Sequence, residues 1–267
     1  MLRTRVIPAL LLRNESLVKT VRFGKFTYVG DPTNTLRIFN ELEVDELAFL
    51  DITATREGRT PNLKVLADIA NECFMPLSYG GGVSSLDQAK AIYEIGFEKI
   101  AVNSAAITNP ILITQIAQVY GSQAVIASID VKNTIWGQQR VRGESGRCRT
   151  NLEPVAWAKE VESRGAGEIL LTSMDREATW AGFDLELVKR VSDSVSIPVI
   201  AHGGAGSVED IRKAVEIGHA SAVAVGSMVV FQKKGMGVLV NFPEQELLRF
   251  YSMNKTLIVK EALQKSS

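Results

Sequence analysis

The amino-acid sequence predicts a (β/α)₈ barrel, an α/β fold in which eight parallel strands alternate with eight helices. Three observations favour it: eight short apolar runs, segments of helical periodicity between them, and an internal repeat. Most of the apolar runs are continuous rather than alternating, which is typical of strands buried on both faces. A doubly wound open sheet is the alternative arrangement for the same series of elements.

The apolar runs place the strands, and the periodic segments place the helices. The predicted strands are residues 6–12, 47–52, 76–79, 100–102, 124–129, 169–172, 198–201 and 222–225. The predicted helices are residues 34–42, 63–72, 85–96, 111–120, 153–164, 184–192, 207–218 and 244–263. Ser85, Asp184 and Ser207 begin three of these helices, where a side-chain oxygen can accept a hydrogen bond from an unpaired backbone N–H.

An internal repeat divides the barrel into two similar halves. Residues 76–105 align without gaps with residues 198–227, at an offset of 122 residues. The matches are Pro76 with Pro198, Gly81 with Gly203, Gly82 with Gly204, Ser85 with Ser207, and Glu94-Ile95-Gly96 with Glu216-Ile217-Gly218. Because no segment resembles a linker, we expect one domain over residues 1–267. The polar segment 132–152 after the fifth strand is expected to form a hairpin or an active-site loop.

Composition excludes several classes of protein. Thirty Lys and Arg residues balance thirty Asp and Glu residues, which argues against a generally basic nucleic-acid binder. No apolar stretch approaches the 18 or so residues that a membrane-spanning helix needs. Cys73 and Cys148 stand far apart, so neither a disulfide framework nor a zinc site is expected. The first apolar run lacks a small-residue cleavage site, so we predict a buried strand, no secretory signal and a cytoplasmic protein. No cofactor or metal is predicted.

Glycine clusters follow two strands that the repeat relates to each other. Active sites of such barrels lie at the carboxyl ends of the strands. Glycine lets backbone N–H groups approach an anion, and a following helix N-terminus adds partial positive charge. The sequence therefore predicts two phosphate cradles, although the glycines could simply form tight turns. The first cradle contains Gly81, Gly82, Asn103 and Ser104, and the second contains Gly203, Gly204, Gly226 and Ser227.

Charged residues also gather at the predicted carboxyl ends. Asp51, Asp130 and Asp175 end strands, and Asp130 is the best general acid or base because it directly follows a buried strand. Helix caps or loop ion pairs are the alternative roles for all three. Two basic clusters favour an anionic substrate, with a solvated loop surface as the alternative. They are Arg13, Lys19, Arg22 and Lys25 after the first strand, and Arg140, Arg142, Arg147 and Arg149 in the polar segment.

Four charged residues stand at the opposite, amino-terminal ends of strands. They are Arg5, Glu46, Lys99 and Glu168, at the starts of the first, second, fourth and sixth strands. Inward-pointing side chains there would form a ring of two cations and two anions. Burial of such charges is costly unless they pair, so we expect a fully paired ring, with a purely stabilising role as the alternative.

These residues resemble the cyclase subunit of imidazole glycerol phosphate synthase over essentially the whole chain. The matching segments are residues 30–32, 45–54, 80–82, 113–125, 164–176 and 198–206. The resemblance implies a barrel that receives ammonia from a glutaminase docked at its amino-terminal face, through a gate formed by the four ring residues. The ammonia would react with a bis-phosphate held in the two cradles, with Lys19, Asp51 and Asp175 among the substrate-binding residues. Two aspartates carry the acid and base work in this family.

One of those aspartates is missing here. The family's first strand reads Pro-Cys-Leu-Asp-Val, whereas residues 8–12 read Pro-Ala-Leu-Leu-Leu, so Leu11 stands at the position of a catalytic carboxylate. Asp130 matches the second aspartate. The family's Asp-Arg-Asp-Gly-Thr after the sixth strand has become Asp175-Arg176-Glu177-Ala178-Thr179. His202 replaces a small residue beside the second cradle.

A narrower resemblance concerns a group of paralogues from surface-polysaccharide loci. The segments 8–12, 17–23 and 72–77 are similar to the glycosyl amidation-associated, cyclase-like proteins. This resemblance implies a partner glutaminase and a sugar amidotransferase that makes acetamidino sugars. The alternatives are a true histidine-pathway cyclase, which makes imidazole glycerol phosphate and a purine-pathway carboxamide, and a conduit for ammonia without chemistry of its own. Glu98, next to Lys99, is expected at the glutaminase interface.

Overall fold

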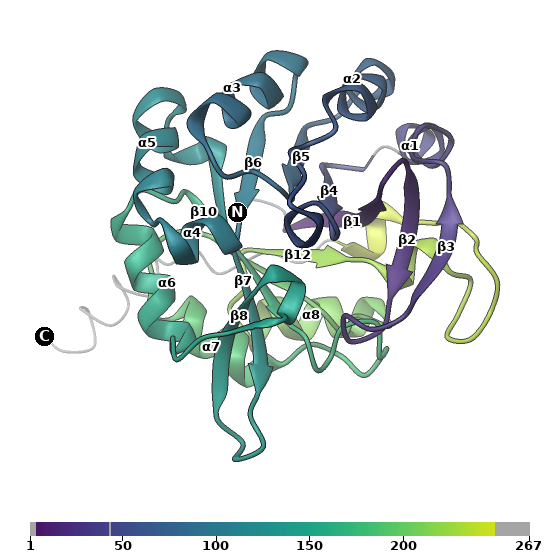
Figure 1. The fold of residues 1–267 in the computed structure, drawn as a ribbon. Helices are drawn as coiled ribbons and strands as arrows, with labels where there is room; N and C mark the ends of the chain where they lie inside the picture. Colours follow the sequence, from purple (N-terminus) through teal and green to yellow (C-terminus); the bar gives the residue numbers. More distant parts are fainter. Residues whose placement is uncertain (1–3, 43, 249–267) are drawn as a thin grey trace, which may run out of the picture.

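The computed structural model describes residues 4–42 and 44–248, which form a TIM barrel (Figure 1). Its parallel strands are β1 (Arg5–Arg13), β4 (Leu47–Asp51), β5 (Leu77–Gly80), β6 (Lys99–Val102), β7 (Val125–Asn133), β10 (Glu168–Ser173), β11 (Val199–His202) and β12 (Ala222–Val225). They pair in chain order, and the ring closes because β12 pairs with β1 and β7 pairs with β10. The barrel prediction is therefore confirmed, and the open-sheet alternative is wrong.

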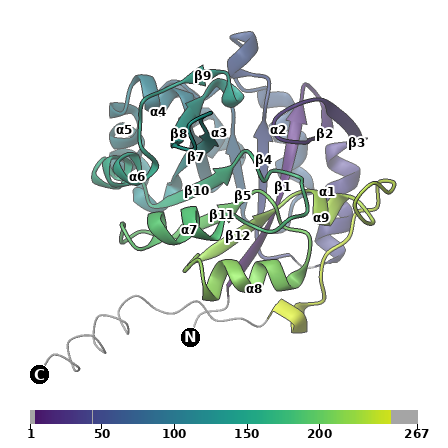
Figure 2. The same cartoon turned by 90° about the horizontal axis from the view of Figure 1, so that it is seen from below.

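Amphipathic helices surround the strands (Figures 1 and 2). They are α1 (Pro32–Glu41), α2 (Leu63–Glu72), α3 (Leu86–Ile95), α5 (Ile111–Tyr120), α6 (Pro154–Ser163), α7 (Leu185–Ser192) and α8 (Val208–Glu216). Ser85, Asp184 and Ser207 each accept a hydrogen bond from a backbone N–H in the first helical turn, as predicted. Short helices α4 (Ser104–Thr108) and α9 (Ser227–Val230) follow β6 and β12. The predicted helix 244–263 begins with a 3₁₀ turn, Gln245–Leu248, and its remainder lies outside the described residues.

Two antiparallel ribbons extend from the carboxyl end of the barrel (Figure 1). Strands β2 (Ser16–Thr20) and β3 (Phe26–Gly30) continue from β1, while β7 turns back into β8 (Gln139–Gly143), followed by β9 (Cys148–Arg149). The second ribbon confirms the hairpin expected in residues 132–152. The first ribbon was not predicted: the segment expected to be a basic loop is a strand whose residues Leu17–Thr20 are buried.

The barrel interior is filled largely by small side chains. Its buried cluster consists of Ile7, Ala9, Ala48, Ala101, Ile126, Leu170, Ile200, Ala222 and Ala224. The larger apolar side chains instead pack between the strands and the helices. None of the helices within the described ranges is both long and apolar enough to cross a membrane. Polar and charged side chains lie at the two ends of the barrel: the ring of Arg5, Glu46, Lys99 and Glu168 at one end, and the residues described below at the other.

Candidate active site

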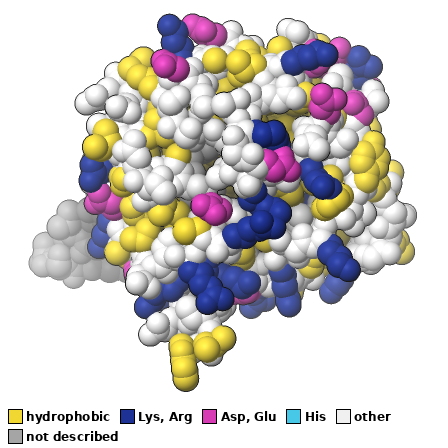
Figure 3. Space-filling view, in the orientation of Figure 1, with side chains coloured by type: hydrophobic (Ala, Val, Ile, Leu, Met, Phe, Trp, Pro, Cys, Tyr) yellow, Lys and Arg dark blue, Asp and Glu magenta, His cyan; other side chains and the backbone are white. Residues whose placement is uncertain are grey.

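An open pocket of about 600 Å³ lies at the carboxyl end of the barrel. Residues from β1, β4, β5, β6, β7, β10 and β11 reach it, together with the β2–β3 connection and the loop after β8. Figure 3 shows this face, where Lys, Arg and acidic side chains gather around its centre. Five of the eleven residues predicted to bind substrate line this pocket, although they come from distant parts of the sequence: Asp51, Gly81, Gly82, Asn103 and Ser104.

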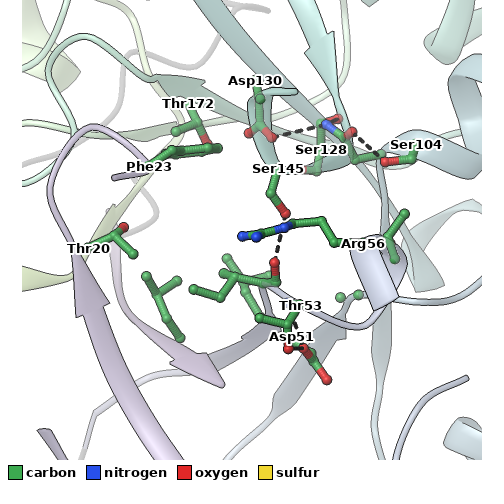
Figure 4. A pocket seen from close by; sticks show the side chains of 18 of the residues that line it. Thr20, Phe23, Asp51, Thr53, Arg56, Ser104, Ser128, Asp130, Ser145 and Thr172 are labelled. Carbon is green, nitrogen blue, oxygen red and sulfur yellow. Dashed lines mark hydrogen bonds between the residues drawn. The ribbon is translucent and has the colours of Figure 1, made fainter. Parts of the chain in front are cut away.

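Asp130 lies near the inner end of this pocket, on β7 (Figure 4). Its carboxylate accepts a hydrogen bond from the Asn103 side chain at 3.3 Å. Burial raises the pKa of Asp130 to about 7; a hydrogen bond with Thr172 opposes the shift, and the nearby charge of Glu177 adds to it. A carboxyl group that titrates near neutral pH can both donate and accept a proton under working conditions.

Thr172 and His202 lie beside Asp130 on the next two strands. Thr172 pairs in register with Asp130 on one side and with His202 on the other. The Thr172 hydroxyl lies 3.1 Å from Nδ1 of His202. Burial, assisted by the charge of Lys19, lowers the pKa of His202 to about 3, so its imidazole is neutral. The three side chains thus form a polar row in which Asp130 is the member that titrates near neutral pH.

The unusual pKa of Asp130 can be measured by a ¹³C NMR titration of its side-chain carboxyl, with an expected value of about 7. Because this exceeds the unfolded value, the folded state holds the proton between about pH 4 and pH 7 and the unfolded state releases it. The free energy of unfolding therefore falls as pH rises through that window. Asp130→Asn should remove this dependence and be more stable than wild type at pH 8. A wild-type carboxyl that titrates near pH 4 would contradict the prediction.

Leu11 forms part of the pocket wall where the resemblance leads one to look for a second carboxylate. Its side chain is 6% exposed and pairs in register with Leu50 and Val18 on the neighbouring strands. An apolar side chain here can neither accept nor donate a proton. Leu11 therefore contributes packing to the pocket that contains Asp130, and it contributes no acid or base group.

The first predicted cradle opens into the pocket. Gly81 has a φ of +119°, and a Cβ on it would lie 2.3 Å from the Asp51 carbonyl oxygen, so only glycine fits. Gly82, Asn103 and Ser104 border the same space. Ser104 lies at the start of α4, and its hydroxyl accepts a hydrogen bond from the backbone of Glu144.

Two of the predicted carboxylates, those of Asp51 and Asp175, accept hydrogen bonds from other residues of the chain. Asp51 borders the pocket, but it accepts hydrogen bonds from the backbones of Thr53 and Ala54, each at 2.9 Å, and lies 3.5 Å from Arg59. Asp175 accepts hydrogen bonds from the backbone and side chain of Asn133, at 2.8 and 2.9 Å, and does not line the pocket. The structure therefore gives both residues the alternative role of loop contacts.

The second predicted cradle is filled. The space bordered by Gly203, Gly204, Gly226 and Ser227 has a volume of about 10 Å³, which is room for about one water molecule. Lys19 extends across Gly226, where a Cβ would approach the lysine's Cε within 2.8 Å. The second predicted cradle is therefore not an open space in this structure, because the Lys19 side chain from β2 extends across it.

The basic clusters are only partly at the pocket. Arg13, Arg22 and Lys25 of the first cluster line it, and Arg13 stacks 3.7 Å above the Phe26 ring. Of the second cluster, Arg147 reaches it, while Arg140, Arg142 and Arg149 do not line it. Sequence reasoning missed Arg56 and Lys132, which also border the pocket. Arg56 lies in a 3₁₀ turn after β4 and Lys132 lies near the end of β7, and neither belongs to a charge run in the sequence.

The four charged residues at the opposite end form a closed ring. Arg5 contacts Glu46 and Glu168, each at 2.6 Å, and Lys99 contacts the same two carboxylates at 3.1 and 3.2 Å. Cations and anions alternate around the barrel axis, so each charge has two opposite neighbours. Within the described ranges, no group of His, Cys, Asp and Glu side chains could hold a metal ion.

Comparison with known proteins gives one consistent result. The family model described as "Histidine biosynthesis protein" matches residues 5–234. A Pseudomonas aeruginosa protein with the provisional name imidazole glycerol phosphate synthase subunit hisF2 is 47% identical over 244 residues, covering 91% of this chain and 97% of that protein. The imidazole glycerol phosphate synthase subunit HisF of Alkaliphilus metalliredigens is 45% identical over 228 residues, covering 85% and 90% of the two chains. A Leptospira borgpetersenii protein with a provisional HisF name is 44% identical, covering 91% and 96%.

Proposed function

The chain belongs to the histidine biosynthesis protein family as a homologue of the HisF cyclase subunit, and on that premise we propose that it uses ammonia from a partner glutaminase for amidation in surface-sugar biosynthesis. The observation that carries the proposal is the combination of an intact charge ring with Leu11. The ring is the feature that ammonia delivery needs, and Leu11 removes a proton-transfer group that ring closure of an imidazole needs.

The charge ring supports entry of ammonia at the amino-terminal face. Glu46 and Glu168 have side chains only 5% and 10% exposed, so the ring lies within the barrel end rather than on open surface. Ala9, Ala48 and Ala101 belong to the buried cluster inside the barrel, and Ala101 also lines the carboxyl-end pocket. Ammonia is a small neutral molecule, and we infer that it passes from the ring through the barrel interior to the pocket. A glutaminase seated over the ring would release ammonia directly into it.

Asp130 supports chemistry in the pocket. Ammonia attacks an electrophilic carbon as a neutral nucleophile, and a leaving group must then take up a proton. A carboxyl group with a pKa of about 7 can supply that proton and later receive one from the new nitrogen. One such group is enough for substitution at one carbon. The cations that line the pocket favour an anionic, phosphorylated substrate.

A conduit without chemistry is the second candidate, and Leu11 is the observation that favours it. In that case the barrel would pass ammonia to a sugar amidotransferase bound at its carboxyl end. Histidine-pathway cyclisation is the family-level alternative. Leu11 and the filled second cradle both weigh against it.

The test is a complex reconstituted with the glutaminase and the sugar amidotransferase and supplied with either glutamine or ammonium salt. Lys99→Ala should lower the glutamine-dependent rate by roughly tenfold, equivalent to about 1.4 kcal/mol of barrier. The ammonium-dependent rate should change less, because free ammonia need not cross the ring. Lys90→Ala, which removes an exposed lysine on α3, is the matched control. Equal losses with both nitrogen sources would show that the ring has no role in delivery.

The same complex separates the enzyme from the conduit. If Asp130 acts as acid and base, Asp130→Asn should lower the rate with both nitrogen sources by about 10²- to 10⁴-fold. A conduit would lose little with either source. The outcome therefore distinguishes the two candidates, whichever sugar accepts the ammonia.

A further inference from the structure

We propose that the pocket accepts a ligand with a single phosphate group, because the chain's own Glu177 carboxylate takes the place of a second one. This inference rests on the proposed function only in assuming that the substrate is phosphorylated. It concerns the second cradle, where the repeat leads one to expect a second anion site. The structure instead places an internal ion pair there.

The ion pair joins strand β2 to the loop that follows β10. The Lys19 ammonium donates a hydrogen bond to Glu177, and the two side chains are 5% and 2% exposed. Glu177 also accepts hydrogen bonds from the Thr20 hydroxyl and the Phe23 backbone N–H, each at 3.3 Å. A carboxylate thus receives the kind of donors that a phosphate would receive: an ammonium, a hydroxyl and a backbone amide.

Two neighbouring residues narrow the same space. Ala178 has a φ of +57°, a conformation that glycine adopts more readily, and its methyl group borders the second cradle. His202 lines the cradle as well and is buried. Its imidazole ring occupies part of this space. Steric filling therefore accompanies the ion pair.

The charge balance of the second cradle also argues against the binding of a phosphate there. Among the described residues that line it, Lys19 is the cation and Glu177 is the anion, so the net charge there is zero. An incoming phosphate would have to displace one buried carboxylate from its lysine, and the two anions would repel each other. At the first cradle, by contrast, Gly82, Asn103 and Ser104 border an open pocket that Arg56 and Arg147 also line.

The number of phosphate ions that bind to the folded chain tests this inference. Each site contributes RT ln(1 + [phosphate]/Kd) to stability, so the slope of the unfolding free energy against ln[phosphate] counts bound ions at saturation. We expect one ion for the wild type, measured by denaturant unfolding at constant ionic strength with chloride as the balancing anion. Glu177→Gly should bind two ions, because it frees the Lys19 ammonium and opens the space. Glu177→Gln, which removes the charge but keeps the volume, should still bind one.

A paired variant keeps the test decisive if Glu177→Gly does not fold. Glu177→Ala combined with Ala178→Gly removes both the carboxylate and the methyl group, and it should bind two ions. Two ions on the wild type, or one on folded variants that open the cradle, would overturn the inference. No bound ion on the wild type would refute the phosphorylated substrate, and with it the single-phosphate assignment. Neither result would affect the glutaminase docking, which the Lys99→Ala comparison tests separately.

Discussion

The purified chain, supplied with ammonium salt and the histidine-pathway bis-phosphate, is expected to turn over at least about a hundredfold slower than a relative with aspartate at the position of Leu11. Imidazole formation moves protons at more than one atom, and the pocket has the buried Leu11 where the resemblance implies a second aspartate. The filled second cradle adds to the loss, because a bis-phosphate cannot seat both ends. Steady-state assays of the two proteins under the same conditions measure the ratio.

Restoration experiments separate the effect of Leu11 on the turnover rate from the effect of the filled second cradle. Leu11→Asp alone should recover part of the rate, and it should recover more in combination with Glu177→Ala and Ala178→Gly. Asp130→Asn added to the combined variant should abolish the gain, which shows that the recovered rate comes from this pocket. Wild-type turnover at rates ordinary for the family would contradict the prediction and return the chain to histidine biosynthesis.

Glu46→Ala is expected to lower the free energy of unfolding by about 3 kcal/mol, because removal of one partner of a buried ion pair leaves the other partner uncompensated. Arg5 and Lys99 would then share Glu168 alone, at the end of a barrel where both cations are largely shielded from water. Urea unfolding followed by circular dichroism measures the change.

Two variants control this measurement. Glu98→Ala removes an exposed carboxylate next to Lys99 and should change stability by less than about 0.5 kcal/mol. Glu46→Ala combined with Lys99→Ala removes one charge of each sign and should cost less than the sum of the two single changes. Additive losses would show that the ring residues do not stabilise one another.

Local patterns in the sequence were sufficient to predict the barrel and the positions of the charge-ring residues. The strands could be predicted because each is a short apolar run, and β10 and β11 coincide closely with two of those runs. The ring could be predicted because Arg5, Lys99 and Glu168 are the first residues of their strands. In a closed parallel barrel all strand starts lie at one end, so position in the strand fixes position in space.

The contents of the second cradle could not be predicted in this way. Lys19 and Glu177 are 158 residues apart, and their pairing depends on how the β2–β3 ribbon and the loop after β10 fold over the barrel end. Strand β3 was missed because the side chains of Phe26, Thr27 and Tyr28 are exposed, without the alternation that marks a half-buried strand. The repeat itself was misleading. Its two glycine pairs, residues 81–82 and 203–204, match in sequence, but the first pair borders an open pocket whereas the second lies beside Lys19 and Glu177.

The charge ring also bears on how the two halves of this barrel recognise each other. The first half supplies Arg5, Glu46 and Lys99, whereas the second half supplies Glu168. Two copies of the first half would bring four cations against two carboxylates, and two copies of the second half would bring carboxylates alone. Ser221 holds the position in the second half that corresponds to Lys99. Neutrality is therefore reached only by unlike halves, so separately produced fragments should reassemble as heterodimers, and a symmetric ancestor would have needed a different set of charges at this end.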